Sequence, residues 1–199
     1  MTPLPPGSTI GIIGGGQLGR MLGVAAAQLG YRTHVYAPEE SGPAADTCSA
    51  WTQGAYDDSE KLGAFADGVD VVTYEFENVD SGAILTLSTH GLVRPGVEAL
   101  RVAQDRLREK DYVAALGGVT APFAAVSGVA DLEAALARIG TPAILKTNRF
   151  GYDGKGQARL NGDADAATAW EAIGGAPSIL EGFVRFDEEF SVILVRGMD

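Results

Sequence analysis

The sequence predicts an α/β fold in two consecutive units, on the basis of three observations. Short apolar segments such as Thr9–Ile13 and Arg32–Tyr36 alternate with a segment of helical periodicity, Gln17–Leu29. The run Arg94-Pro95-Gly96 then interrupts this alternation. A second set of apolar and amphipathic segments follows, with a glycine-rich loop at 151–156 between two of its expected strands.

The first unit is expected to be a parallel sheet covered by helices. Thr9–Ile13 is an apolar run that ends in glycines, as a buried strand does. The next helix ends at Gly30, and its apolar positions are Leu18, Met21, Leu22, Ala25 and Leu29. A second helix is expected at Ser59–Ala66 and a further strand at Val69–Tyr74. This strand–helix–strand order is typical of a Rossmann-like unit.

The second unit is expected to be a smaller α+β layer. It opens with an amphipathic helix at Gln104–Leu116, which Gly117-Gly118 ends. Further strands are expected at Pro122–Val126, Ala143–Thr147, Ser178–Val184 and Glu189–Val195, and helices at Asp131–Ile139 and Ala164–Ile173.

Composition indicates a globular protein and excludes several classes. The chain has 199 residues, of which 46% are hydrophobic and 21% charged, so disorder is not expected. No apolar run approaches the ~18 residues of a membrane span, and Met1–Ser8 does not resemble a secretory signal. The single cysteine, Cys48, excludes an internal disulfide framework and fits the reducing cytoplasm, where we expect the protein to reside.

Charge points to a small anionic ligand rather than to nucleic acid. The net charge is −11, which argues against a nucleic-acid backbone as the main partner. Between Lys146 and Arg159, however, there are four basic residues and one acidic residue. Chance surface charge is the alternative interpretation of this cationic stretch.

Two motifs in the first unit could meet a ligand. Gly14-Gly15-Gly16-Gln17-Leu18-Gly19 matches the G-x-G-x-x-G pattern directly after a strand, where backbone N–H groups can approach a phosphate. A tight turn without a nucleotide is the alternative. Glu75 and Asn78 follow the strand that ends at Tyr74, at the sheet edge where ligands of α/β folds bind. Glu75 and Glu77 would repel each other on one face of an extended strand, which favours a binding role for at least one.

Two motifs in the second unit indicate an anion site. Lys146 lies in an apolar strand, where its ammonium must reach water or an anion such as a phosphate. Gly151-Tyr152-Asp153-Gly154-Lys155-Gly156-Gln157 has three glycines whose N–H groups could wrap a triphosphate, with Lys155 adding charge. The segment is not a P-loop, because no Ser or Thr follows the lysine. A plain hairpin turn is the alternative.

In combination, these motifs resemble the 5-(carboxyamino)imidazole ribonucleotide synthase family of ATP-grasp ligases. The matching segments occur in the family's order, and the resemblance runs from about Ile10 to Val195. They are residues 14–22, 74–79, 104–110, 145–147 and 151–157. The resemblance implies a Rossmann-like pre-ATP-grasp domain at 1–100, an ATP-grasp lid subdomain at 101–182 and the start of the ATP-grasp domain at 183–199.

The resemblance also implies site residues. ATP would be contacted by Arg106, Lys146, Gly151, Tyr152, Asp153, Gly154, Lys155, Gly156, Gln157, Glu181, Gly182, Phe183, Val184 and Glu189. Of these, residues 181–184 would hold adenine and Glu189 the ribose hydroxyls. The aminoimidazole ribonucleotide would meet Gln17, Leu18, Glu75, Tyr152, Asp153 and Lys155, and the glycine-rich start would serve its phosphate. Asp153, which would orient the substrate amine, and Lys155 are the catalytic candidates.

The activity implied is the ATP- and bicarbonate-dependent carboxylation of 5-aminoimidazole ribonucleotide, through carboxyphosphate, in purine biosynthesis. ATP and Mg²⁺ would be the cofactors, and the protein would be a homodimer without a nucleic-acid or membrane partner. Family members are nearly twice as long, and their magnesium ligands lie in a half that is absent here, so we expect the 199 residues alone to be inactive.

Three alternatives remain open at the level of sequence. The first is another ATP-grasp ligase, such as a formate-dependent ribonucleotide transformylase or a biotin carboxylase-like enzyme. The second is an NAD-dependent oxidoreductase, which would explain only residues 11–40. The third is a non-catalytic nucleotide-binding fragment.

Overall fold

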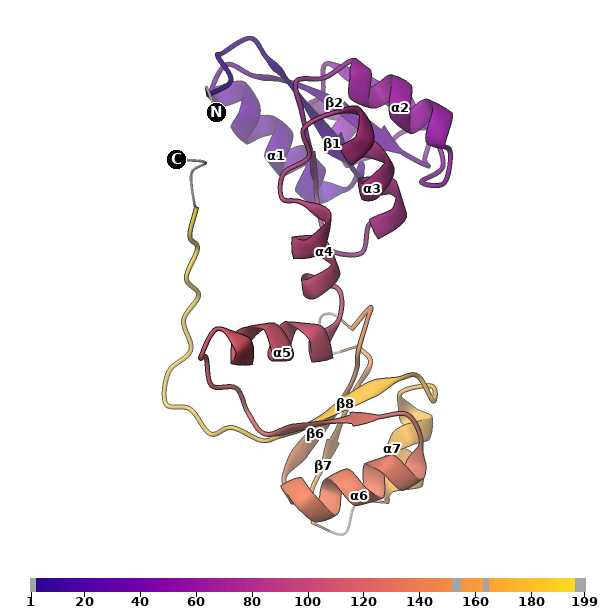
Figure 1. Ribbon diagram of the computed structural model, residues 1–199, viewed down its shortest axis with the longest axis vertical. Helices are drawn as coiled ribbons and strands as arrows, with labels where there is room; N and C mark the ends of the chain where they lie inside the picture. The colour runs from indigo at the N-terminus through magenta and orange to yellow at the C-terminus, as the bar shows by residue number, and fades with distance from the viewer. Residues whose placement is uncertain (1–2, 152–154, 163–164, 196–199) are drawn as a thin grey trace. The chain divides into compact units, whose positions relative to one another are not determined.

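The computed structural model describes residues 3–151, 155–162 and 165–195, and the chain divides into two compact units (Figure 1). The units are Met1–Arg101 and Val102–Asp199. Each has its own sheet and its own core, so each is described separately.

The first unit contains a parallel sheet in the strand order β3-β2-β1-β4. Its strands are β1 (Thr9–Ile13), β2 (Arg32–Ala37), β3 (Ala50–Gln53) and β4 (Val71–Tyr74). Its helices are α1 (Gln17–Gln28), α2 (Ser59–Asp67), α3 (Ser81–His90) and α4 (Val97–Ala103), with a short 3-10 helix at Pro43–Asp46. The expected parallel α/β unit is therefore confirmed.

The centre of this sheet is buried on both faces, as the apolar residues of β1 and of the second half of β2 indicate. Ile13 and Tyr36 pack with α2 and α3 on one side, and Ile12 and Val35 form a smaller cluster on the other. The Tyr36 hydroxyl donates a hydrogen bond to the Ala55 carbonyl at 2.7 Å, which satisfies the polar tip of this buried side chain. Cys48 packs against the smaller cluster.

The second unit contains an antiparallel sheet in the order β5-β8-β6-β7. Its strands are β5 (Phe123–Val126), β6 (Ala143–Thr147), β7 (Gln157–Leu160) and β8 (Ser178–Gly182). Its helices are α5 (Arg106–Ala115), α6 (Val129–Ile139) and α7 (Ala166–Ala172). Leu145, Leu160 and Leu180 pack with residues of α6 and α7 in one core, so these helices cover one face of the sheet. Helix α5 buries none of its residues.

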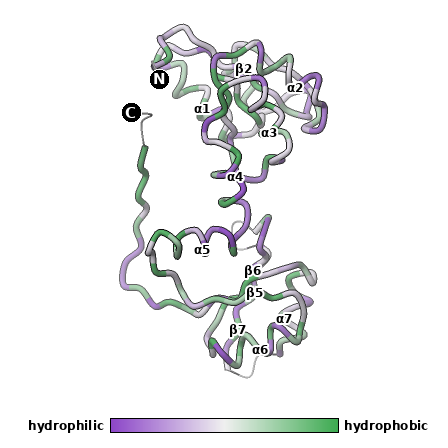
Figure 2. The backbone as a smooth tube through the Cα atoms, in the orientation of Figure 1, coloured by the Kyte–Doolittle hydropathy of each residue, from purple (hydrophilic) through white to green (hydrophobic). Residues whose placement is uncertain are grey.

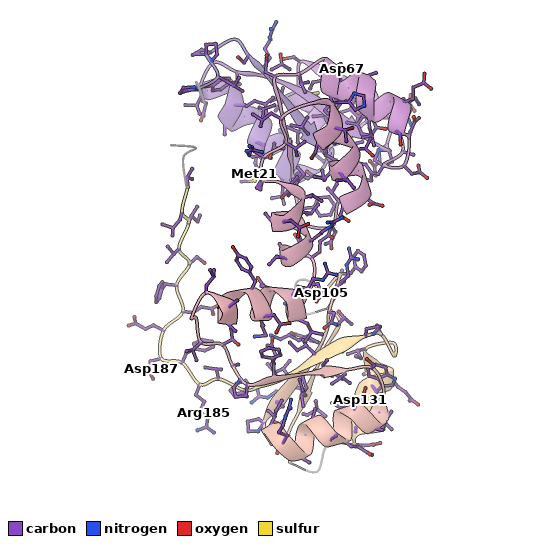
Figure 3. All side chains as sticks on the ribbon, in the orientation of Figure 1. Met21, Asp67, Asp105, Asp131, Arg185 and Asp187 are labelled. Carbon is purple, nitrogen blue, oxygen red and sulfur yellow. The ribbon has the colours of Figure 1, made fainter. Side chains whose placement is uncertain are left out.

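The helix expected at Gln104–Leu116 is present as α5, Arg106–Ala115. Helix α4 ends at Ala103, and α5 begins only at Arg106. Between them Asp105, labelled in Figure 3, accepts hydrogen bonds from the N–H groups of Leu107 and Arg108. An aspartate in this position is an N-cap, so it starts a new helix instead of continuing the preceding one.

The strand expected at Glu189–Val195 is not present. Residues 183–195 form neither helix nor strand, although Figure 2 shows the last part of this segment to be largely hydrophobic. The side chains of Phe190 and Ile193 are 83% and 91% exposed. Apolar alternation specifies a strand only where a neighbouring strand supplies hydrogen bonds, and none pairs with this segment among the described residues.

Candidate functional site

A carboxylate held between two lysines lies on the sheet face opposite α6 and α7. Ala143 and Leu145 of β6 belong to the core on the α6–α7 side, so the alternate residue Lys146 points to the other face. Glu181 of β8 lies opposite Ile144 and therefore shares that face with Lys146. The Lys146 Nζ atom is 2.7 Å from Glu181 Oε2, and the Lys110 Nζ atom is 3.0 Å from Glu181 Oε1.

All three side chains of this cluster are largely buried. The exposed fractions are 12% for Glu181, 15% for Lys110 and 24% for Lys146. Burial by itself would raise the pKa of the Glu181 carboxyl, but the hydrogen bonds and charges of Lys146 and Lys110 lower that pKa below its ordinary value. Lys146 therefore reaches an anion, as expected, but in this structure the anion is a carboxylate of the same chain and not a phosphate.

The cluster predicts an acid-sensitive second unit. Because the pKa of Glu181 is lower in the folded chain than its ordinary value of 4.5, the cluster stabilises the fold above that pH and loses this effect as pH falls further. We expect the free energy of unfolding of the second unit to drop between pH 5 and pH 3, and to drop less in Glu181→Gln. Urea titrations over this range measure the difference.

The matched control is Glu171→Gln, which removes an exposed carboxylate of α7 in the same unit. An acid response that is the same in wild type and Glu181→Gln would show that the cluster does not contribute.

Arg106 binds the backbone at the start of the glycine-rich loop. Its Nε and Nη2 atoms donate to the carbonyls of Thr147 and Gly151 at 3.2 and 2.8 Å, and its backbone N–H donates to the Asn148 carbonyl at 3.1 Å. Next to it, Arg149 Nη2 donates to Gln104 Oε1 at 3.0 Å. Arg106 therefore fixes the backbone at the start of the loop, a role that charge counting alone does not predict.

The far end of the loop is also fixed. Gly156 has a φ of +66°, and a Cβ atom there would lie 2.6 Å from Thr147 Oγ1. The Gly156 carbonyl accepts a hydrogen bond from the Thr147 N–H at 2.8 Å. Phe150 has a φ of 62°, an uncommon conformation for a residue with a side chain. Tyr152, Asp153 and Gly154 lie outside the described residues; Lys155 is exposed, and Gln157 begins β7.

A cavity of about 500 Å³ adjoins the loop ends. It is lined by Asp105, Thr147, Asn148, Arg149, Phe150, Gly156, Ala176 and Pro177. The Asn148 Oδ1 atom is buried and has no hydrogen-bond partner within the described part of the chain. A donor from a ligand or from water would satisfy it.

The remaining residues expected at the ATP site lie at the end of β8 and after it. Gly182 ends that strand, and the Phe183 ring lies 4.4 Å from the Arg159 guanidinium. Val184 is 51% exposed, and Glu189 is exposed in the segment without regular structure. The structure thus gathers Arg106, Lys146, Glu181 and both ends of the loop in the second unit, and leaves Glu189 outside any described cluster.

In the first unit, Glu75 occupies the N-terminus of α1. Its Oε1 and Oε2 atoms accept hydrogen bonds from the N–H groups of Gly16 and Gly19 at 3.0 and 2.6 Å. A Cβ atom on Gly14 would lie 2.6 Å from the Glu75 side chain. The glycines therefore make room for a carboxylate of the same chain, and a ligand phosphate at these two N–H groups would have to displace it.

This arrangement corrects the argument from like-charge repulsion. Glu75 and Glu77 follow β4 in a bend and a turn, so they do not share a face of an extended strand. Asn78 Nδ2 donates to Glu77 Oε1 at 3.2 Å. Glu75 is instead brought beside Gln17 and Leu18, the two residues between the N–H groups that it binds, so these three expected substrate residues do lie together.

Comparison with known proteins agrees with this two-unit organisation. Residues 7–104 match the ribonucleotide synthetase preATP-grasp domain, and residues 111–199 match the ATP-grasp domain. The N5-carboxyaminoimidazole ribonucleotide synthase of Brucella melitensis biotype 1 is 49% identical over 98% of this chain and 54% of its own length.

Two solved structures are similar over most of the chain. One is an ADP complex of an N5-carboxyaminoimidazole ribonucleotide synthetase, with a TM-score of 0.87 and 39% identity over 92% of this chain and 49% of that one. The other is the Aspergillus clavatus N5-carboxyaminoimidazole synthase in complex with ADP and 5-aminoimidazole ribonucleotide, with a TM-score of 0.80 and 27% identity over 92% and 48%.

The fold and these matches define an ATP-grasp protein that carries a preATP-grasp domain. Within that class, the chain is similar over nearly all of its length to N5-carboxyaminoimidazole ribonucleotide synthases. It spans about half the length of the synthases it matches.

Proposed function

We propose that this protein acts in the ATP-dependent carboxylation of 5-aminoimidazole ribonucleotide to N5-carboxyaminoimidazole ribonucleotide in purine biosynthesis. The observation that carries the proposal is the cationic cluster of Lys146, Lys110 and Glu181 in the same unit as a glycine-rich loop fixed at both ends. A related structure with ADP and 5-aminoimidazole ribonucleotide bound supports the choice of ligands.

The proposed chemistry makes bicarbonate reactive. A bicarbonate oxygen attacks the γ-phosphorus of ATP, the bond from that phosphorus to the bridging oxygen breaks, and ADP leaves. The amine of the ribonucleotide then attacks the carbon of carboxyphosphate. The carbon–oxygen bond to the phosphoryl group breaks, inorganic phosphate leaves with the electron pair, and the amine gives up one proton to water.

The roles proposed for the residues follow from charge and position. Lys146 and Lys155 would offset phosphate charge, as fixed cations do in phosphoryl transfer. Arg106 would keep loop 151–157 placed over the phosphates, and the loop would shield carboxyphosphate from water. Asp153 would orient the substrate amine, and residues 181–184 and Glu189 would hold the nucleoside of ATP.

The preATP-grasp unit would hold the ribonucleotide. Gln17, Leu18 and Glu75 lie together at the start of α1. On the family resemblance alone, Tyr152, Asp153 and Lys155 are proposed as further residues for the ribonucleotide. Since Glu75 already occupies two N–H groups of α1, we propose that the ribonucleotide meets the side chains of this cluster and not those N–H groups.

Mg²⁺ is expected to accompany ATP. In the described part of the chain, no three His, Cys, Asp or Glu side chains form a group that could hold a metal ion. The steps above therefore assign no role to a metal held by these residues.

Partners and location also remain proposals. Within the described residues, no helix combines the length and apolar character that crossing a membrane requires. A homodimer in the cytoplasm is proposed on the family resemblance alone.

The test of the proposal is ligand-dependent phosphate release by the full encoded protein. We expect slow release from ATP alone, and a clear stimulation when 5-aminoimidazole ribonucleotide and bicarbonate are both present. Formate and glycinamide ribonucleotide serve as controls, because other ATP-grasp ligases use them. Equal stimulation by either control would contradict the assignment.

A further inference from the structure

We infer that Lys110 is a positioning residue for nucleotide binding, because it shares Glu181 with Lys146 and so preserves a positive charge at Lys146. The inference rests on the proposed function in one respect only, namely that Lys146 meets a phosphate of ATP.

The three side chains of the cluster do not balance one another in charge. Each oxygen of Glu181 takes one ammonium, with Lys110 on Oε1 and Lys146 on Oε2. Lys146 and Glu181 alone would form a neutral pair with little attraction for a polyanion. With Lys110 present, the three groups carry a net charge of one positive unit in a largely buried environment, where charge is weakly screened.

The position of Lys110 follows from α5. Arg106 and Lys110 are four residues apart on this helix, so their side chains lie on the same face. Arg106 binds the carbonyls of Thr147 and Gly151, and Lys110 reaches Glu181 and lies 5.6 Å from the centre of the Phe123 ring. One face of α5 therefore contacts both the start of the glycine-rich loop and Glu181 of the charge cluster.

A purely structural role for Lys110 is the competing explanation. No residue of α5 is fully buried in a core, so the contacts of Arg106 and Lys110 could serve only to anchor the helix. The two explanations differ in what happens when Glu181 is neutralised together with Lys110. Charge balance predicts recovery of nucleotide binding, because Lys146 then keeps a net positive charge. Anchoring predicts none.

The experiment is titration of the full encoded protein with ATP by calorimetry. Lys110→Met should weaken ATP binding roughly tenfold, and Lys110→Arg, which keeps the charge, should bind within about threefold of wild type. Adding Glu181→Gln to Lys110→Met should recover affinity relative to Lys110→Met, and Glu181→Gln alone is measured beside it because it reports any loss of the nucleoside contact proposed for residues 181–184. Arg108→Gln is the matched control, because it removes an exposed positive charge from the same helix.

Thermal unfolding of each variant checks that α5 and the sheet remain folded. ATP binding by Lys110→Met as tight as that of wild type would overturn the inference, and so would a double variant that stays as weak as Lys110→Met. A wild-type protein that does not bind ATP would contradict the proposed function instead.

Discussion

Replacement of Lys146 by alanine is expected to weaken ATP binding by about 10- to 150-fold. A charge-assisted hydrogen bond contributes roughly 1.5–3 kcal/mol, and each 1.4 kcal/mol corresponds to about a tenfold change in affinity. Binding of 5-aminoimidazole ribonucleotide should change little, since the residues proposed for it lie at the start of α1 and in loop 151–157. Calorimetric titration of the full encoded protein with each ligand measures both effects.

The variant should remain folded, because Glu181 keeps Lys110 as its ion-pair partner when Lys146 is removed. The matched control is Lys61→Ala, which removes an exposed lysine of the first unit. An equal loss of affinity for both ligands, or no loss for either, would show that Lys146 serves the fold and not the nucleotide.

Replacement of Glu75 by alanine is expected to destabilise the first unit by roughly 2–4 kcal/mol. The change leaves the N–H groups of Gly16 and Gly19 without their carboxylate and removes a negative charge from the N-terminus of α1. No acidic residue lies in the first turn of α1, and Gly16 provides no side-chain cap, so nothing in the helix itself replaces Glu75. Urea denaturation followed by circular dichroism measures the loss.

Glu75→Gln should show a smaller loss, because an amide oxygen can still accept one of the two hydrogen bonds. Glu40→Ala, an exposed carboxylate that follows β2, is the control. If Glu75→Ala unfolds like the control, the contact with Gly16 and Gly19 is not important for stability. The glycine-rich turn would then be available to a ligand phosphate.

The sequence predicts the elements whose signals are local. Strand β1 follows directly from its apolar run and glycine boundary. Helix α1 lies where it was expected, but its apolar positions Leu18, Met21 and Leu22 are exposed, and the residues that it buries are Gly19, Gly23 and Ala26. Strand β3 is not predicted from the sequence, because Ala50–Gln53 is only four residues long and has no apolar alternation. Helix α3 has an Asp80 cap, but the apolar residues of Ser81–His90 give a weak helical pattern.

The candidate site is predictable as a set of residues but not as a set of contacts. Lys146 and the glycine-rich loop have visible signals, a charge in an apolar strand and closely spaced glycines. The partner of Lys146 depends on the register of β6 and β8, which places Ile144 opposite Glu181 across a separation that local pattern does not encode. One sequence feature could have pointed to Lys110: it lies four residues after Arg106 on an expected helix, which places both side chains on one face.

For Glu75, too, the sequence predicts the kind of contact but not the partner. The G-x-G-x-x-G pattern correctly predicts backbone N–H groups that bind an anion at a helix N-terminus. The anion is a carboxylate 59 residues away from Gly16 in the same chain. Only the crossover that brings β4 beside β1 reveals this, because it places Glu75 next to the turn.

Activation of bicarbonate by ATP is tested most directly by following the transfer of a bicarbonate oxygen to inorganic phosphate. The full encoded protein is supplied with ATP, 5-aminoimidazole ribonucleotide and bicarbonate labelled with ¹⁸O, and the inorganic phosphate is analysed by mass spectrometry. Transfer through carboxyphosphate predicts one labelled oxygen in each phosphate released, since the attacking bicarbonate oxygen leaves with phosphorus. Phosphate that carries no label while ADP and carboxylated product accumulate would contradict this account.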